Sequence, residues 1–216
     1  MSVRPGQPWE RPAAGRPEHE VHGGDRELAA AVAAHPGARF RFLADPSSDV
    51  ARAIGARAGA HAVGAELAMD ALAWNGRLAV NMVVVGVPPD RLTRWTRAPT
   101  CSVAVDGHRV FAGRATSVVV ATGQFLRGAN VVPRGHPGDG RIEILVLHVP
   151  PGQRAGLRRR ITTGDHLPHP SITQRSGRAV TIEAATPVRI EADGASEGAV
   201  ARVVVEVVAG AYRLVV

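Results

Sequence analysis

The sequence predicts a two-domain protein of mixed α and β structure, dominated by β, in which a small α/β unit precedes a larger β-sandwich. Two observations carry this prediction. Up to about residue 66, helix-like segments alternate with a short apolar strand, as in α/β folds. From about residue 67 onward, short runs of β-branched residues recur between turn residues, which is typical of antiparallel sandwiches. With 216 residues, of which 45% are hydrophobic, the chain is long enough to bury a core.

The α/β unit is expected over residues 21–66, behind a loose tail. Residues 1–20 interleave prolines and arginines with few apolar side chains, so burial cannot offset the entropy of ordering them. The pattern DRELAAAVAAH then predicts a helix, RFRFLA a strand, and SDVARAIGARAG a second helix. Ser47 or Ser48 can cap that second helix, because a serine hydroxyl accepts a hydrogen bond from a first-turn amide.

The β-sandwich is expected over residues 67–210, and a terminal strand over 211–216 is expected to return to the first unit. Asn75-Gly76 and Asp106-Gly107 stand between apolar runs as two-residue hairpin turns. Helical inserts are expected near 88–96 and 151–160. The expected strands cover residues 78–87, 102–105, 109–111, 115–121, 142–149, 179–184, 188–191, 199–208 and 212–216.

The charge of the chain is +7, yet it carries little functional information by itself. All 26 basic residues are arginine, beside abundant Ala, Gly and Pro, which is typical of a GC-rich genome. The cluster of Arg154 and Arg158 to Arg160 is read as a solvated helix face, with contact to anionic lipid as the alternative. Only 4% of the residues are aromatic, which argues against nucleic acid as a partner because few rings are present to stack bases.

The expected compartment is the cytoplasm. The N-terminus has no apolar segment of the kind found in secretory signals, and the single cysteine, Cys101, cannot form an internal disulfide. Cys101 is read as a packed thiol. His166 and His169 invite a zinc interpretation, but the prolines beside them favour a plain turn.

Five collinear segments resemble the diacylglycerol kinase and sphingosine kinase-like lipid kinase family. The clearest are VVVATGQFLRGANVVPRGHPGDGRIEILVL (118–147) and TGDHLPHPSITQRSGRAVTIEAATPVRIEADG (163–194), with their Gly-rich stretch, Asp-Gly turn, His-x-x-His-Pro turn and final Asp-Gly. Weaker matches are HGGDRELAAAVAA (22–34), FLADPSSDVARAIG (42–55) and NGRLAVNMVVVG (75–86). The resemblance spans residues 22–216 and identifies the first unit with part of the family's nucleotide-binding lobe.

The resemblance implies transfer of the ATP γ-phosphoryl group to a lipid hydroxyl with Mg²⁺, either in the cytoplasm or at the inner face of a membrane. Such transfer depends on positioning and charge neutralisation. Gly23, Gly24, Asp25 and Asp49 match the family's nucleotide-binding positions, Asp139 its metal-associated loop, and Asp193 the Asp of its catalytic Asp-Gly-Glu. ATP and Mg²⁺ are the cofactors that the resemblance implies.

This sequence departs from the family pattern where the chemistry is expected. Arg26 and Glu27 replace a Gly and a Thr beside the phosphate, Asp45-Pro46 replaces Gly-Thr, and Ala195 replaces the Glu that would accept the hydroxyl proton. Glu197 is expected to lie too far along the strand to substitute. As an alternative, Arg26 itself contacts a phosphate.

Three hypotheses follow from these departures. The chain is a weakly active lipid kinase, a non-catalytic lipid-binding or regulatory relative that forms a homo-oligomer or pairs with an intact kinase, or a fragment of a split or mis-started gene. The third is suggested by the short stretch before His22, where the family has further strands and helices of its nucleotide lobe.

Overall fold

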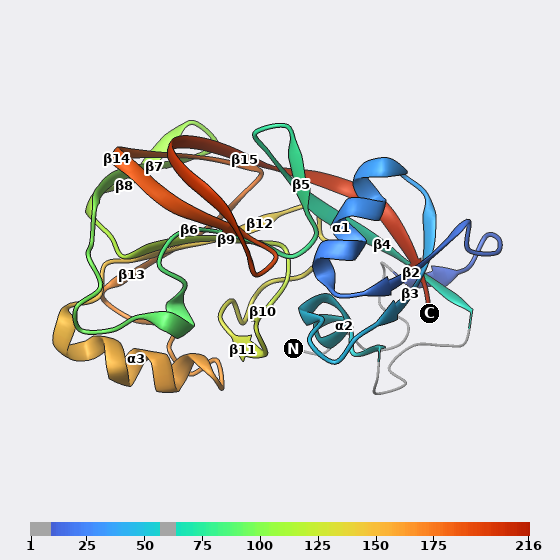
Figure 1. Cartoon of the computed structure of the whole chain (residues 1–216), viewed down its shortest axis with the longest axis horizontal. Coiled ribbons are helices and arrows are strands. Elements are labelled where there is room, and N and C mark those ends of the chain that lie inside the picture. The colour runs from blue at the N-terminus through green and yellow to red at the C-terminus, as the bar shows by residue number, and fades with distance from the viewer. Residues whose placement is uncertain (1–9, 57–63) are drawn as a thin grey trace.

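A computed structural model describes residues 10–56 and 64–216 and resolves two lobes joined by long strands (Figure 1). Most of the described secondary structure is β, and the predicted α/β unit followed by a β-sandwich is confirmed. The first lobe contains strands and helices from both ends of the chain: β1 (Glu10–Pro12), β2 (His19–Gly23), α1 (Asp25–Ala34), β3 (Arg39–Ala44), α2 (Asp49–Ala53) and the last residues of β15 (Ala195–Val215).

The first lobe is built on a β2–α1–β3 crossover. Strands β2 and β3 are parallel, and the end of β15 pairs with β3 on its other side, also in parallel, with Arg213 opposite Arg39. The C-terminal strand therefore lies in the sheet of the first lobe. Helix α1 places Leu28 and Val32, one turn apart, in a core that includes Phe40 and Tyr212.

Strands β4 (Ala65–Trp74) and β15 connect this lobe to the sandwich. They pair antiparallel from Trp74 opposite Val205 to Glu66 opposite Val215, with an irregularity between Val208 and Tyr212. One long ribbon therefore belongs to both lobes, which sets their relative position. The hairpin strand β5 (Arg77–Ala79) extends this ribbon beside α1.

The sandwich has two layers that share strand β14 (Ala179–Ala192). The first part of β14 pairs with β7 and its last part pairs with β6, with a register shift between Glu183 and Val188. That bend lets one strand pass from one layer to the other. Parts of β4 and β15 also belong to the layers. Their remaining strands are β6 (Met82–Gly86), β7 (Thr100–Val105), β8 (His108–Arg114), β9 (Ser117–Ala121), β12 (Ile142–Leu147) and β13 (Ile172–Gly177).

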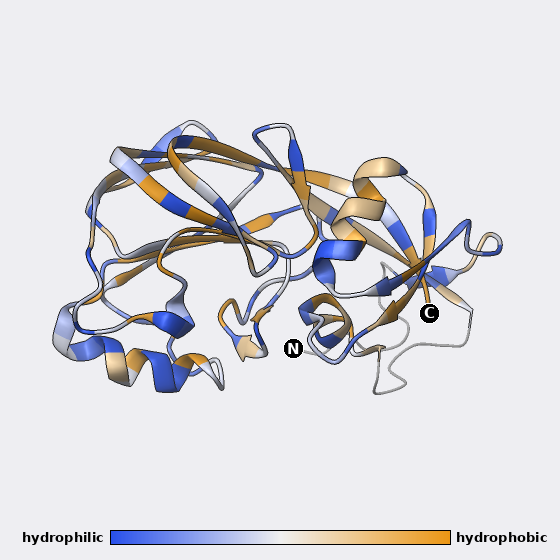
Figure 2. Ribbon diagram, viewed as in Figure 1, coloured by the Kyte–Doolittle hydropathy of each residue, from blue (hydrophilic) through white to orange (hydrophobic). Residues whose placement is uncertain are grey.

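Two hydrophobic cores lie in the sandwich lobe. One fills the space between the layers and includes Cys101, whose thiol is buried. The other lies on the outer face of β6, β9 and β12. The segments that cover it are η2 (Pro89–Arg91), β10 (Phe125–Leu126), β11 (Ala129–Asn130), η3 (Pro151–Gln153) and α3 (Arg154–Ile161). Figure 2 shows both hydrophilic and hydrophobic residues along α3, and Leu157 and Ile161 are its buried hydrophobic residues.

The structure differs from the sequence-based expectations at several elements. β4 was not predicted as a strand, residues 78–87 divide into β5 and β6, and only Pro89–Arg91 of the expected insert near 88–96 is helical. The expected loose tail over 1–20 is wrong at β1 and at the start of β2, because strands order those residues. Backbone pairing of β1 to β4 and of β2 to β3 supplies that order without apolar side chains.

Within the described residues, no helix has both the length and the apolar character needed to cross a membrane.

Candidate functional site

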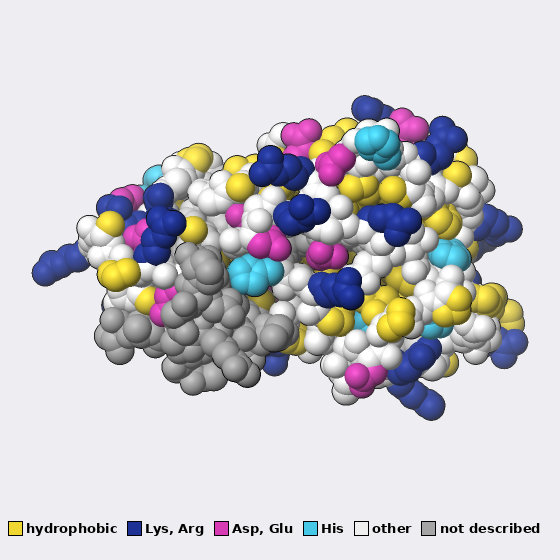
Figure 3. All heavy atoms as spheres, turned by 180° about the vertical axis from the view of Figure 1, so that it is seen from behind, with side chains coloured by type: hydrophobic (Ala, Val, Ile, Leu, Met, Phe, Trp, Pro, Cys, Tyr) yellow, Lys and Arg dark blue, Asp and Glu magenta, His cyan; other side chains and the backbone are white. Residues whose placement is uncertain are grey.

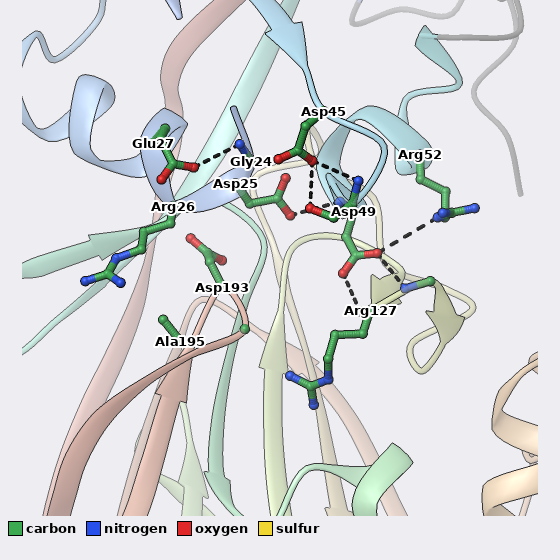
Figure 4. Close-up of a pocket in the computed structure, with 13 residues that line it drawn as sticks. Gly24, Asp25, Arg26, Glu27, Asp45, Asp49, Arg52, Arg127, Asp193 and Ala195 are labelled. Carbon is green, nitrogen blue, oxygen red and sulfur yellow. Dashed lines mark hydrogen bonds and ion pairs between the residues drawn. The ribbon is translucent and has the colours of Figure 1, made fainter. Parts of the chain in front are cut away.

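A cavity of about 460 Å³ lies where the first lobe meets the sandwich (Figure 4). That volume is within the usual range of small-molecule sites. Four segments far apart in the sequence form its wall: the start of α1, the loop into α2, the β10–β11 turn and the β14–β15 turn. The lining residues are Gly24, Asp25, Arg26, Glu27, Asp45, Ser47, Asp49, Arg52, Arg127, Gly128, Asp193, Gly194 and Ala195.

Asp25 is the first residue of α1, and its buried carboxylate joins α1 to α2. It accepts hydrogen bonds from the Ser48 hydroxyl at 2.6 Å, from the Asp49 amide at 3.1 Å and from the Val50 amide. Burial raises the pKa of Asp25 to about 6, and the Ser48 hydroxyl opposes that shift. Asp25 therefore caps the start of α2, and its oxygens are already engaged.

The side chain of Asp49 joins α2 to the sandwich. Its carboxylate accepts hydrogen bonds from the backbone amides of Arg127 and Gly128, the latter at 2.8 Å. Burial raises the pKa of Asp49, and these two amides oppose the rise. Both predicted nucleotide-binding carboxylates therefore lie at the cavity, where Asp25 joins α1 to α2 and Asp49 joins α2 to the sandwich.

Asp193 occupies the tight turn between β14 and β15, at φ 46°. Its carboxylate accepts hydrogen bonds from the amides of Val80 at 2.8 Å, Asn81 at 3.0 Å and Met82 at 3.0 Å. Burial raises the pKa of Asp193 to about 7, against the effect of the amide donors and with a contribution from Asp25. The predicted catalytic residue therefore lines the cavity, with both carboxylate oxygens bonded to the backbone.

The Gly-Gly-Asp segment begins α1, and the chain closes this helix N-terminus itself. The amide of Gly24 donates to the Glu27 carboxylate at 2.9 Å, as in half of a capping box. Gly23 has φ 124°, and a Cβ there would contact Glu27 at 3.0 Å. Free amides at a helix N-terminus bind anions. Here Glu27 occupies the Gly24 amide.

Arginines supply the positive charge of the cavity. Arg127 is ion-paired to Asp90 and Glu191, so its charge is already balanced. Arg52 lies 3.9 Å from Asp49. Figure 4 shows the Arg26 side chain beside Asp193 and Ala195. The sequence analysis did not identify Arg127 as a site residue. In the structure, Arg127 and Gly128 both have positive φ and form a tight turn, and the glycine at position 128 is the one sign of that turn in the sequence.

Five carboxylates line the cavity, against three guanidinium groups: Asp25, Glu27, Asp45, Asp49 and Asp193 face Arg26, Arg52 and Arg127. The Asp45 carboxylate also accepts hydrogen bonds from the amide and the hydroxyl of Ser47, at 2.8 and 2.6 Å. Carboxylates repel phosphates unless a cation lies between them. The acidic balance therefore does not suit a free polyphosphate.

Asp139 lies away from this cavity. It is exposed in the turn before β12, accepts a hydrogen bond from the Arg141 amide at 3.0 Å, and is absent from the lining. The buried carboxylate of that region is Asp70, which accepts from the amides of Gly140 and Gly210. Asp139 as a metal ligand stays a prediction, and the structure does not bring it together with Asp25, Asp49 and Asp193.

The described residues do not fit a Mg²⁺ held by protein ligands alone. Among them, no group of three or more His, Cys, Asp or Glu side chains is placed to hold a metal ion. The carboxylates of the cavity accept backbone hydrogen bonds instead. A protein site for Mg²⁺ usually combines one or two carboxylates with substrate phosphates.

Ala195 lines the cavity two residues after Asp193 and carries no titratable group. Glu197 is absent from this lining and is ion-paired to Arg77. The expectation that Glu197 cannot take the place of the missing glutamate agrees with this geometry.

Comparison with known proteins shows the family to which the chain belongs. The profile of the YegS C-terminal NAD kinase β-sandwich-like domain matches residues 55–216. No curated protein is significantly similar in sequence. Among solved structures, a diacylglycerol kinase from Bacillus anthracis strain Sterne superposes with a TM-score of 0.73 at 17% identity, over 91% of this chain and 75% of that chain.

Two nucleotide kinases share the fold more distantly. Yeast NADH kinase complexed with NADH has a TM-score of 0.54 at 11% identity, over 93% of this chain and 62% of that chain. An NAD kinase from Archaeoglobus fulgidus in complex with ATP has a TM-score of 0.50 at 14% identity, over 90% of this chain and 76% of that chain. At these identities the likeness concerns the fold.

Proposed function

The chain belongs to the YegS C-terminal NAD kinase β-sandwich-like domain family, and we propose that it is a diacylglycerol kinase-like protein. In this proposal it keeps a ligand cavity between its lobes and transfers a phosphoryl group to a lipid hydroxyl weakly or not at all. In this role it is a lipid-binding or regulatory relative of an active lipid kinase.

The observation that carries the proposal is the hydrogen bond from the Gly24 amide to the Glu27 carboxylate. An amide at a helix N-terminus is a natural partner for a phosphate oxygen. Here that amide is engaged by an anion of the same chain, and the same carboxylate would repel an approaching phosphate. A nucleotide phosphate would have to displace Glu27 to bind the Gly24 amide.

The second support is the state of the groups that could act as a base. A general base must reach the proton it removes. Ala195 has no such group, Glu197 is held by Arg77, and both oxygens of Asp193 accept backbone hydrogen bonds. Each of these arrangements lowers the expected rate of proton transfer from a lipid hydroxyl.

One observation favours a second candidate, a working lipid kinase with Asp193 as its base. The raised pKa of Asp193, about 7, is close to the value that suits a general base at neutral pH. In that case the residue would exchange one of its backbone hydrogen bonds for the substrate hydroxyl during the reaction.

Nucleotide binding is the first test. We would titrate the protein with ATP and with Mg-ATP by calorimetry, and compare Glu27→Thr with Glu183→Thr. Glu183 is exposed on β14 and ion-paired to Arg202, so its substitution is a matched loss of one carboxylate outside the cavity. We expect weak binding by the parent and by Glu183→Thr, and at least about tenfold tighter binding by Glu27→Thr, since a competing charge-assisted hydrogen bond is removed.

Phosphoryl transfer is the second test, with labelled ATP, Mg²⁺ and a panel of diacylglycerol, sphingoid base and phosphatidylglycerol. We expect weak or no turnover by the parent, and much faster turnover by Ala195→Glu combined with Arg26→Gly and Glu27→Thr. Turnover by the parent as fast as that of this triple variant, and lost in Asp193→Asn, would replace the proposal with the second candidate. Tight binding of ATP by the parent would contradict the role assigned to Glu27.

A further inference from the structure

A solvent-exposed tryptophan lies on the sandwich lobe, away from the interlobe cavity. Trp95 is 77% exposed and follows η2 in the chain. The guanidinium of Arg94 lies 4.3 Å from the centroid of its ring, a cation–π distance. Tryptophan is enriched at binding and membrane interfaces because its large apolar ring carries a polar N–H.

The loop that carries Trp95 is held in place by a buried arginine. Arg154, at the start of α3, is 4% exposed and donates to the carbonyl oxygens of Thr96 at 2.7 Å, Thr93 at 3.2 Å and Arg94 at 3.3 Å. Its Nε donates to the carbonyl oxygen of Val149. Arg154 is therefore unavailable to a partner, unlike the other arginines of α3. Its role is to fix the loop so that Trp95 points outward.

Beside Trp95 lies a second cavity, of about 480 Å³, with a positively charged wall. It is separate from the interlobe cavity, since the two share no lining residue. None of the described residues that line it is Asp or Glu. The lining residues are Arg94, Trp95, Thr96, Arg97, Ala98, Arg114, His148, Val149, Pro150, Pro151 and Arg154.

Helix α3 adds further positive charge next to this loop. Arg158 donates to the carbonyl oxygen of Leu92, directly before the loop, while Arg159 and Arg160 are exposed in the next positions. On the face seen in Figure 3, arginines lie among acidic and apolar side chains. We define the basic tryptophan surface as Arg94, Trp95, Arg97 and Arg158.

We propose that the basic tryptophan surface docks on a bilayer that contains anionic phospholipid, with Trp95 inserted at the interface and a phosphate of a lipid headgroup in the cavity beside it. The argument rests on charge complementarity and on the exposed indole of Trp95. Tryptophan favours the headgroup region of a bilayer because its ring is apolar and its N–H is polar. Arginines near an anionic surface strengthen binding additively and in a salt-dependent way.

The test is co-sedimentation of the full chain with phosphatidylcholine vesicles, with and without phosphatidylglycerol, over a range of salt concentrations. We expect binding only with phosphatidylglycerol, weaker at high salt, and accompanied by a blue shift of tryptophan fluorescence. Trp95→Ala should lose that shift and bind several-fold more weakly. Arg94→Glu with Arg97→Glu should weaken binding by at least about 25-fold, because the loss of each arginine is expected to weaken it about fivefold.

The matched control is Arg189→Glu with Arg202→Glu, which makes the same change of net charge at exposed positions of β14 and β15. This variant should keep most of the binding. An equal loss in the control would mean that net charge alone attracts the protein, and would overturn the assigned surface. Binding to pure phosphatidylcholine, or displacement of the protein from vesicles by duplex DNA at low concentration, would overturn the anionic bilayer as the partner. Circular dichroism of each variant establishes that it is folded.

Discussion

Removal of one hydroxyl group, by Tyr212→Phe, is expected to stabilise this protein. Tyr212 lies in the last part of β15, opposite Met69, and is fully buried in the core of the first lobe. Its ring meets Phe40 edge to face at 6.3 Å, so packing of the ring is favourable. Its hydroxyl has no hydrogen-bond partner among the described residues.

The size of the effect follows from that missing partner. A hydroxyl that loses its water on folding and gains no partner costs about 1–3 kcal/mol in protein mutational data. Phenylalanine keeps the ring and removes the cost, so the free energy of unfolding should rise by about 1–3 kcal/mol. For a protein of this size, each kcal/mol corresponds to about 2–4 °C in the melting temperature. Burial also raises the pKa of Tyr212, so the hydroxyl stays protonated at neutral pH.

The assay is unfolding by urea and by heat, followed by circular dichroism, for the parent, Tyr212→Phe and Tyr212→Ala. The alanine variant removes the ring and should lose about 3–5 kcal/mol, as other large aromatic side chains do in cores. A Phe variant less stable than the parent would refute the reasoning, because it would mean that the hydroxyl finds a partner such as a buried water.

Three further outcomes are expected. Ser48→Ala should lower the free energy of unfolding by about 1–2 kcal/mol, because Ser48 caps α2 and donates to Asp25. Ser47→Ala, at an exposed position, should change that free energy by less than about 0.5 kcal/mol. Urea unfolding measures both. The pKa is raised to about 6 for Asp25 and to about 7 for Asp193, from an ordinary value of 3.8. Between about pH 4 and 7 these two groups therefore bind more protons in the folded protein than in the unfolded chain. Their contribution to the free energy of unfolding falls as the pH rises over that range. Unfolding across that range should show a flatter profile for Asp25→Asn with Asp193→Asn, and an unchanged profile would contradict the shifts. Gly86→Ala should cost more than about 1 kcal/mol in thermal unfolding, because Gly86 has φ +105° and a Cβ there would overlap a neighbouring carbonyl oxygen.

The order and type of many elements could be predicted from the sequence because their signals are local. Helix α1 shows its apolar period, and the Asp106-Gly107 turn occurs between β7 and β8 as expected. The family resemblance extended this to the arrangement of the lobes. β4 escaped prediction because AELAMDALAW is rich in helix-forming residues, and only its pairing with β15 makes it a strand.

The candidate site was predictable in its membership but not in its contacts. Gly24, Asp25, Asp49 and Asp193 line one cavity, whereas Gly23 and Asp139 are absent from its lining, and the roles expected of these six residues stay predictions. Nothing in the order of residues indicates which amides each carboxylate accepts. The partners of Asp193, residues 80–82, lie more than a hundred positions earlier in the chain.

The sequence by itself therefore determined the fold class, the family and the residue types near the cavity, because propensity, periodicity and motif spacing are properties of short segments. Tertiary structure alone decided how those residues are used. It engaged Asp25, Asp49 and Asp193 with amides of distant segments, buried the Tyr212 hydroxyl and placed Arg154 against the loop that carries Trp95. The physical reason is that hydrogen-bond partners, burial and the pKa shifts they cause depend on which distant segments meet in space.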